Sequence, residues 1–156
     1  MSDPALLDLA RELGARESGL SVVVTSRAGG AAQTSVVNAG VLAHPMTGKR
    51  VVGFVARGGA NKLNNLRARP RVTVVFRSGW EWVAVEGDAE LVGPHDHMEG
   101  LERNGMPRVR REVYAAAVGG TADDWGAMDE VMDAEGHTAV LICPVRVYSN
   151  PPKSSA

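Results

Sequence analysis

Apolar and polar residues follow strand-like patterns in six segments of the chain. Each segment is four or more residues of alternating or continuous apolar character, rich in Val and bounded by turn residues, which is typical of β-strands. The segments are Leu20–Arg27, Ala31–Ala43, Arg50–Arg57, Arg71–Ser78, Trp80–Gly93 and His137–Asn150. Gly29 and Gly30 predict a tight hairpin between the first two segments. Pro144 predicts an edge or a bulge in the last, because proline cannot donate a ladder hydrogen bond.

Helical patterns lie outside these segments. The first begins with Asp3 as an N-cap and Pro4 at the first helical position, and has leucines at helical spacing. A short helix from about Ala60 should end before Pro70, since the residue before proline disfavours helical angles. Two more are expected between the last two strands. They are Met98–Ala117 and Thr121–Glu135, the latter with Thr121 as cap and Asp124 as its box partner.

The order of these elements predicts a mainly β fold with flanking helices. Six or more mostly antiparallel strands would close into a barrel with the helices packed outside, rather than form alternating strand and helix units. A length of 156 residues suits one domain with a real core. We place this domain at residues 1–150 and expect the tail, 151–156, to be frayed.

The fifth strand has two different faces. Val83, Val85 and Leu91 share an aliphatic face that suits the core, while Trp80 and Trp82 stand on the opposite, mixed face. Large aromatic side chains in that position line a subunit interface or a ligand cleft, or lie under a helix.

Composition narrows the classes of function. The single cysteine, Cys143, excludes an internal disulfide and a cysteine cluster for zinc. The chain has no apolar run long enough to span a membrane, and its N-terminus lacks the basic start of a signal peptide. We therefore expect a cytoplasmic protein whose redox chemistry, if any, requires a bound cofactor.

The small net charge of -1 conceals a strong separation of charge along the chain. From Ser18 to Trp80 there are nine basic residues and no acidic one, and the remainder holds all 18 acidic residues with eight basic ones. This pattern indicates a site for a small polyanion, or else bases scattered over a solvated surface. Nucleic acid is disfavoured, because the acidic remainder and an isoelectric point of about 6.4 oppose a phosphate backbone.

The stretch VARGGANKLNNLRARPRV, Val55–Val72, concentrates the features of an anion site. Gly58 and Gly59 allow backbone amides to approach a ligand closely. The following helix start offers unpaired amides and a partial positive charge, beside which Arg57 and Lys62 add two cations. The stretch lacks the GK[ST] ending of a Walker A loop. Its alternative reading is an ordinary helix start with solvated bases.

Other groups of reactive residues have simpler explanations. His95 and His97 have no third ligand nearby, which indicates a solvated loop and no metal site. Cys143 lies in an apolar strand and suits packing. Asp123 and Asp124 suit a helix start rather than a catalytic carboxylate pair, and Ser35 has no histidine in local reach. A hydrolase is therefore disfavoured.

Four stretches of the chain are characteristic in combination. They are QTSVVNAG, VARGGANKLNNLRARPRVTVVFRSGWEWVAVEGDAELVGP, TADDW and TAVLICPVRVYSNP. With these stretches the chain resembles the flavin and deazaflavin oxidoreductases of the split β-barrel fold, which are related to pyridoxamine 5'-phosphate oxidase. It is most similar to their actinobacterial branch that uses the deazaflavin F420, and the resemblance runs from Leu6 to Pro151.

The resemblance implies an FMN-binding type of split barrel that forms a homodimer, with two cofactor sites at the interface built from both chains. Arg57, Gly58, Ala60, Asn61 and Lys62 would hold the cofactor phosphate. The second strand would run beside the ring with Gln33, Ser35, Val36, Val37 and Asn38. Trp80 and Trp82 would come from the partner chain. The basic segment agrees with F420, whose phosphate continues into a lactyl and glutamyl tail; FMN is the alternative cofactor.

The implied reaction is hydride transfer from reduced F420 to an unsaturated or conjugated small molecule, such as a tetrapyrrole like biliverdin, a quinone or a planar xenobiotic. The cofactor carries the difficult step, and the protein fixes distance and angle. Water, an arginine or a hydroxyl could supply the proton, and Tyr114 and Tyr148 are able to donate. The alternatives are an FMN-dependent oxidase or reductase, and a non-catalytic protein that carries or sequesters F420.

Overall fold

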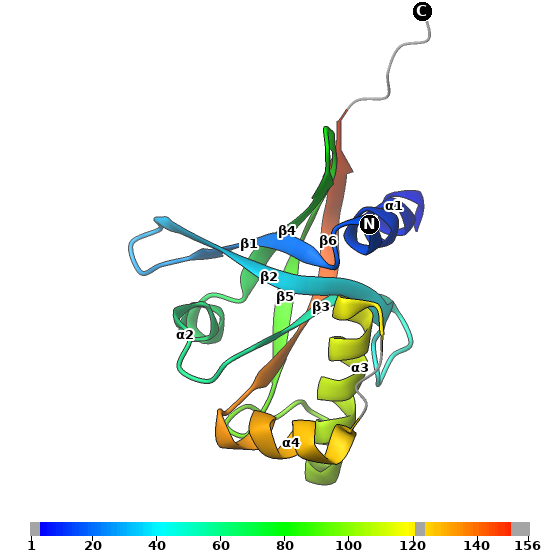
Figure 1. Ribbon diagram of the computed structural model, residues 1–156. Coiled ribbons are helices and arrows are strands. Elements are labelled where there is room, and N and C mark those ends of the chain that lie inside the picture. Colours follow the sequence, from blue (N-terminus) through cyan, green and yellow to red (C-terminus); the bar gives the residue numbers. More distant parts are fainter. Residues whose placement is uncertain (1–3, 121–123, 151–156) are drawn as a thin grey trace, which may run out of the picture.

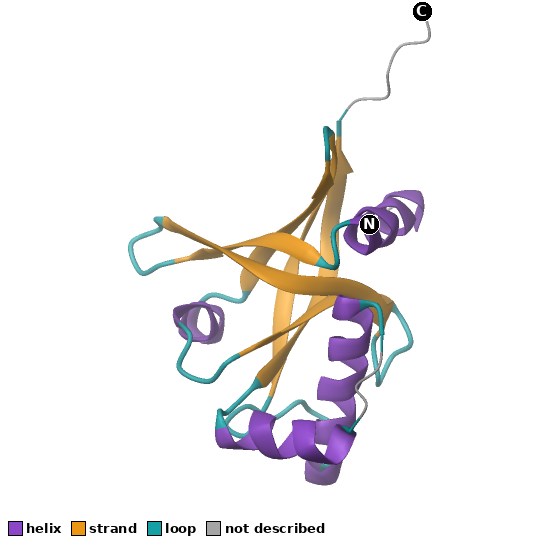
Figure 2. Ribbon diagram, viewed as in Figure 1, coloured by secondary structure: helices purple, strands orange, loops and turns teal. Residues whose placement is uncertain are grey.

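The protein is an antiparallel β-barrel with four helices around it. The computed structural model describes residues 4–120 and 124–150. Six strands close in the order β1–β2–β3–β6–β5–β4, and each neighbouring pair is antiparallel (Figures 1 and 2). The strands are β1 (Leu20–Ser26), β2 (Ala32–Ala43), β3 (Arg50–Ala56), β4 (Arg71–Ser78), β5 (Glu81–Val92) and β6 (Thr138–Ser149). The predicted fold class and all six predicted strands are confirmed.

The helices are α1 (Pro4–Arg16), α2 (Asn61–Ala68), α3 (Met106–Val118) and α4 (Trp125–Ala134). A short 3-10 turn, Arg103–Gly105, leads into α3. None of the described helices has the length and apolar character needed to cross a membrane. Three expectations from the sequence fall outside the described residues. They concern Asp3 as an N-cap, Thr121 as a cap and the tail, residues 151–156.

Two predicted helix starts were wrong. The helix expected from Met98 begins only at Met106, because Gly100 has φ of +84°, which interrupts a right-handed helix. Met98 and Leu101 are buried in the preceding loop, which explains the misleading apolar pattern. The next helix begins at Trp125, and Asp124 is its N-cap rather than a box partner, since its side chain accepts a hydrogen bond from the Ala127 amide at 3.0 Å.

The barrel and its outer surface form two apolar clusters. The interior contains Phe54 and Phe76 and is filled further by leucines of α1 and α2, among them Leu13 and Leu63. On the outside, Val113 of α3 packs with residues of β2, β3 and β6. The expected core face of β5 is confirmed for Val83 and Val85, which are fully buried, while Leu91 is partly buried against the same cluster. The helix α3 therefore covers one side of the barrel wall.

The strands β3 and β6 separate toward one end of the barrel. The pairing of β3 with β6 extends only from Val52 to Ala56, whereas β6 continues along β5 to Ser149. A register shift beside Glu86 and Gly87 places Pro144 opposite Gly87, so the predicted edge or bulge at Pro144 is confirmed. Gly87 is required there, because a Cβ atom would lie 2.0 Å from the Cys143 carbonyl oxygen.

A fully buried arginine joins α3 to the segment around α4. Arg110 donates from Nη2 to Asp133 Oδ1 at 2.6 Å and from Nη1 to the His137 carbonyl at 3.3 Å. Its side chain has no solvent exposure, whereas that of Asp133 is largely exposed. Arg110 therefore helps to hold α4 against α3, together with the ion pair between Arg111 and Asp129 and the ring contact between Tyr114 and Trp125.

We predict that Arg110→Ala lowers the free energy of unfolding by about 2–4 kcal/mol, because it removes two hydrogen bonds and leaves a cavity. Urea denaturation measures the change. Arg108→Ala is the matched control, since Arg108 is exposed on the same helix and pairs with Glu112 at 3.7 Å. We expect a loss within about 0.5 kcal/mol. Equal losses in the two variants would contradict this role of Arg110.

Candidate cofactor site

A cavity lies where the barrel wall meets α2, α3 and α4. Its volume is about 330 Å³, within the range of small-molecule sites. It is lined by Val36, Val37 and Asn38 of β2, Val55, Ala56 and Arg57 at the end of β3, Lys62 of α2, Tyr114, Ala117 and Val118 of α3, Met132 of α4, and His137 before β6. Segments far apart in the sequence thus line one cavity.

The loop between β3 and α2 needs its two glycines for different reasons. A Cβ atom on Gly58 would lie 2.8 Å from the Gly136 carbonyl oxygen, so the loop packs directly on the turn between α4 and β6. Gly59 has open space but a φ of +82°, which disfavours other residues. The Gly58 amide donates to the Glu135 carbonyl at 3.1 Å. This amide, expected to face a ligand, is therefore used within the chain.

The start of α2 offers donors to an anion. Its N-cap is Ala60, without a side-chain cap, and its first turn holds no acidic residue. The amides of Asn61 and Lys62 belong to that first turn, where helical geometry provides no partner. The helix ends at Ala68, and Arg69 is extended, as Pro70 predicts.

The charge of the basic segment is partly neutralised in the folded chain. Four of its nine cations pair with carboxylates from the acidic remainder: Arg50 with Asp8, Arg57 with Glu135, Arg67 with Asp96, and Arg71 with Glu86 and Asp88. The expected broad basic field is therefore narrower than the sequence indicated. No carboxylate partner is recorded among the described residues for Lys62, which lines the cavity.

Of the five residues of β2 that were expected beside the cofactor ring, three line the cavity and two do not. Val36, Val37 and Asn38 line the cavity. Gln33 lies further along β2, where its side chain accepts a hydrogen bond from Asn65 Nδ2 at 3.0 Å, and Ser35 is also outside the lining. Gln33 is thereby held against α2.

The two tryptophans expected from the partner chain lie away from this cavity. Trp80 is 91% exposed in the turn between β4 and β5. Trp82 packs edge-to-face on Tyr148, with ring centroids 5.9 Å apart. The guanidinium carbon of Arg146 lies over the Tyr148 ring, 4.3 Å from its centroid. Only Tyr114, of the two candidate proton donors, lines the cavity.

Sequence reasoning missed two residues next to the expected phosphate position. The Glu135 carboxylate accepts from Arg57 Nη2 at 3.2 Å and contacts His137 Nε2 at 3.0 Å. The buried Nδ1 atom of His137 has no hydrogen-bond partner among the residues that the structure describes. These residues follow α4 and carry no motif, so only the fold could bring them to Arg57.

The cavity suits a ligand with a planar ring and an anionic end. Valines and Met132 form apolar walls, while Arg57, Lys62 and the uncapped start of α2 form a cationic end. The unpaired Nδ1 atom of His137 is a further sign of a missing partner. A flavin-type cofactor has this combination of ring and phosphate, so the residues present fit such a group.

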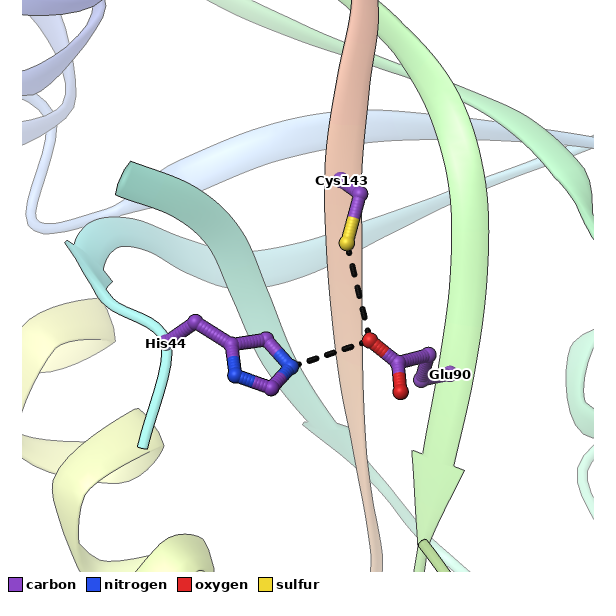
Figure 3. A group of neighbouring side chains, drawn as sticks. All are labelled: His44, Glu90 and Cys143. Atoms are coloured by element: carbon purple, nitrogen blue, oxygen red, sulfur yellow. Dashed lines mark hydrogen bonds and ion pairs between the residues drawn. The ribbon is translucent and has the colours of Figure 1, made fainter. Parts of the chain in front are cut away.

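A second cavity of about 630 Å³ opens where β3 and β6 separate. His44, Glu90 and Cys143 meet there, with ligand atoms within 4.8 Å of one another (Figure 3). His44 Nε2 lies 2.9 Å from Glu90 Oε1, and the Cys143 thiol donates to the same oxygen at 3.5 Å. Nitrogen, carboxylate and sulfur are ligands that zinc prefers.

Local hydrogen bonds argue against a metal at this cluster. The amides of Met46 and Thr47 donate to His44 Nδ1 at 3.1 and 3.3 Å, so Nε2 carries the proton and donates to Glu90. A metal would need the Nε2 lone pair and would push the proton onto Nδ1, against both amides. Burial, followed by the nearby Glu90 charge, raises the pKa of Cys143, which keeps the thiol protonated. We interpret the cluster as a hydrogen-bonded network.

The other sequence hypotheses on reactive residues have simple outcomes. His95 and His97 are exposed in a loop, as predicted, and neither belongs to the metal-capable group found among the described residues. Cys143 is half-buried, and its thiol donates a hydrogen bond to Glu90 in addition to any packing against apolar side chains.

Comparison with known proteins places this fold in context. A family model described as pyridoxamine 5'-phosphate oxidase matches residues 8–145. No curated protein matches the chain. A solved conserved hypothetical protein from Mycobacterium tuberculosis is 21% identical, with a TM-score of 0.66, and the match covers 100% of this chain and 92% of that one.

Two further solved structures are similar to this chain. A pyridoxamine 5'-phosphate oxidase-related, FMN-binding protein from Nostoc punctiforme is 14% identical with a TM-score of 0.63, covering 94% of this chain and 82% of that one. An F420 reductase is 15% identical with a TM-score of 0.53, covering 83% and 88%. At these identities the structures support the fold, while the family model covers most of the sequence. The chain belongs to the pyridoxamine 5'-phosphate oxidase family.

Proposed function

We propose that the protein is an F420-dependent reductase that transfers a hydride to an unsaturated or conjugated small molecule. The observation that carries this proposal is the cavity with apolar walls and a cationic end, formed by β2, the start of α2 and the helical insert. Membership of a family that includes flavin-dependent oxidoreductases supports a redox role. An F420 reductase and an FMN-binding protein share the fold.

The proposed phosphate position is the loop between β3 and α2. Arg57 and Lys62 would provide charge, and the first-turn amides of Asn61 and Lys62 would donate hydrogen bonds beside Ala60 and Gly58. Val36 and Val37, with their neighbours on β2, would contact the ring. Each charge-assisted hydrogen bond contributes about 1.5–3 kcal/mol, so a few suffice for useful affinity.

The preference for F420 over FMN rests on the sequence resemblance. The narrower basic field gives F420 less support than the linear sequence did, because four of the nine cations are paired. FMN therefore remains the alternative cofactor and an FMN-dependent oxidase or reductase the alternative enzyme.

Bound F420 in its reduced form would supply the hydride. The protein would orient the ring against the apolar wall and exclude water from the reacting face. Tyr114 lines the cavity with its ring packed edge-to-face on Trp125, which fixes its position. Its hydroxyl is the candidate for delivering the proton to the reduced product.

A second copy of the chain would complete the site. Leu20, Val22 and Val36 form an exposed apolar face on β1 and β2, where Val22 lies opposite Val36 and also opposite Val75 of β4. Exposed apolar patches of this kind mark interaction surfaces. Because Val36 also lines the cavity, a homodimer through this face would bring partner residues, including Trp80 and Trp82, toward the cofactor.

We predict that the apoprotein binds F420 more tightly than FMN. Fluorescence titration of the apoprotein should give micromolar or tighter binding of F420 and at least about tenfold weaker binding of FMN, a difference of about 1.4 kcal/mol. Tighter binding of FMN would favour the alternative enzyme. Tight F420 binding without turnover across a broad panel of acceptors would favour a carrier or sequestering protein. Binding of neither cofactor would contradict the proposal.

We predict that the Lys62 side chain contributes to F420 affinity. Lys62→Ala should weaken F420 binding by about tenfold or more, because it removes one charge-assisted hydrogen bond. Lys49→Ala is the matched control, since Lys49 also belongs to the basic segment but lines the other cavity. An equal effect of the two substitutions would point to general electrostatic attraction instead of a specific contact.

We predict that the exposed face around Val22 forms the homodimer interface. Val22→Asp should shift the protein toward monomers in sedimentation velocity, because burial of an unpaired charge at an interface is costly. Val131→Asp introduces the same charge at an exposed site on α4 and should leave the assembly unchanged. A stable dimer in the Val22→Asp variant would exclude this face as the interface.

A further inference from the structure

We propose that Glu135 competes with the cofactor phosphate for Arg57 and thereby limits cofactor affinity. This inference rests on the proposed function, since it assumes that an anionic group occupies the cationic end of the cavity. It assigns a role to a residue that contacts two lining residues of the cavity and that no sequence motif indicates.

The Glu135 carboxylate bridges two residues of the cavity wall. One oxygen accepts from Arg57 Nη2 at 3.2 Å, and the other lies 3.0 Å from His137 Nε2. Arg57 and His137 both line the cavity. The backbone of Glu135 is held as well, because its carbonyl accepts from the Gly58 amide at 3.1 Å. The carboxylate is therefore fixed beside the proposed phosphate position.

The contact with Arg57 is weak enough to be exchanged. It is a single hydrogen bond, and the Arg57 side chain is 71% exposed. Exposed pairs of this kind contribute about 1 kcal/mol or less. Glu135 has a second partner in His137, so it can release Arg57 without losing all of its hydrogen bonds. A phosphate could then take the freed guanidinium donor.

Glu135 is also the acid that a bound phosphate would meet. The residues that line the cavity include no aspartate or glutamate among those described. The carboxylate of Asp133, two residues before Glu135, instead accepts a hydrogen bond from Arg110 at 2.6 Å. A phosphate at Arg57 and Lys62 would therefore be repelled mainly by Glu135.

Removing the Glu135 charge should strengthen anion binding. Glu135→Gln keeps the size of the side chain and its ability to accept from Arg57, but removes the competing negative charge. We expect F420 or FMN to bind about fivefold more tightly, the change that about 1 kcal/mol produces. Glu130→Gln is the matched control, because Glu130 is an exposed acid on α4, five residues before Glu135, and forms no ion pair with the residues that the structure describes. It should change affinity less than about twofold.

A double-mutant cycle tests whether the effect passes through Arg57. In an Arg57→Ala background, Glu135→Gln should gain much less than in the wild-type protein, since the competition requires both partners. The readout is the dissociation constant from fluorescence titration with F420 and FMN, and from calorimetry with inorganic pyrophosphate. Circular dichroism of each variant verifies that the fold is retained.

The outcomes separate this inference from the proposed function. Tighter binding by Glu135→Gln that disappears without Arg57 supports it. Binding by the wild-type protein that is unchanged or weakened in Glu135→Gln overturns it, while the cofactor proposal stands. An equal gain in Glu130→Gln also overturns it, because general charge would explain the effect. Absence of binding to F420, FMN and pyrophosphate in all variants overturns both proposals.

Discussion

The close approach of Gly58 to the turn between α4 and β6 determines where the candidate site lies. No side chain fits on Gly58, since a Cβ atom would lie 2.8 Å from the Gly136 carbonyl oxygen and 2.9 Å from that of Glu135. The loop after β3 therefore packs backbone to backbone on this turn. As a consequence, Lys62 at the start of α2 and His137 before β6 line one cavity.

The barrel and the helical insert contribute different properties to this cavity. Strands β2 and β3 provide a rigid wall, because both are paired within a closed barrel. The insert of α3 and α4 provides the opposite wall, and Arg110 helps to fix its position, because it donates to both Asp133 and the His137 carbonyl. The same arginine thus links the stability of the insert to the geometry beside the proposed phosphate position.

The sequence was sufficient for the strands and for the loop from Arg57 to Lys62, because alternation, glycines and a helix start are local signals. The sequence-based predictions were wrong or incomplete where contacts between distant segments determine the local structure or the charge. Met98 and Leu101 have helical spacing, yet Gly100 with φ of +84° keeps them in a buried loop. Arg71 looked like part of a free basic field, but strand pairing places it against Asp88. Glu135 lies 78 residues from Arg57, so no local pattern could reveal their contact.

We propose that the cavity between β2, α2 and the helical insert holds the phosphate and ring of a flavin-type cofactor. A crystal structure of the protein grown with F420 tests this binding position. We expect the cofactor phosphate within hydrogen-bond distance of Lys62 and Arg57, with the ring against Val36 and Val37 of β2. A cofactor bound elsewhere, such as in the cavity beside His44 and Glu90, would contradict it.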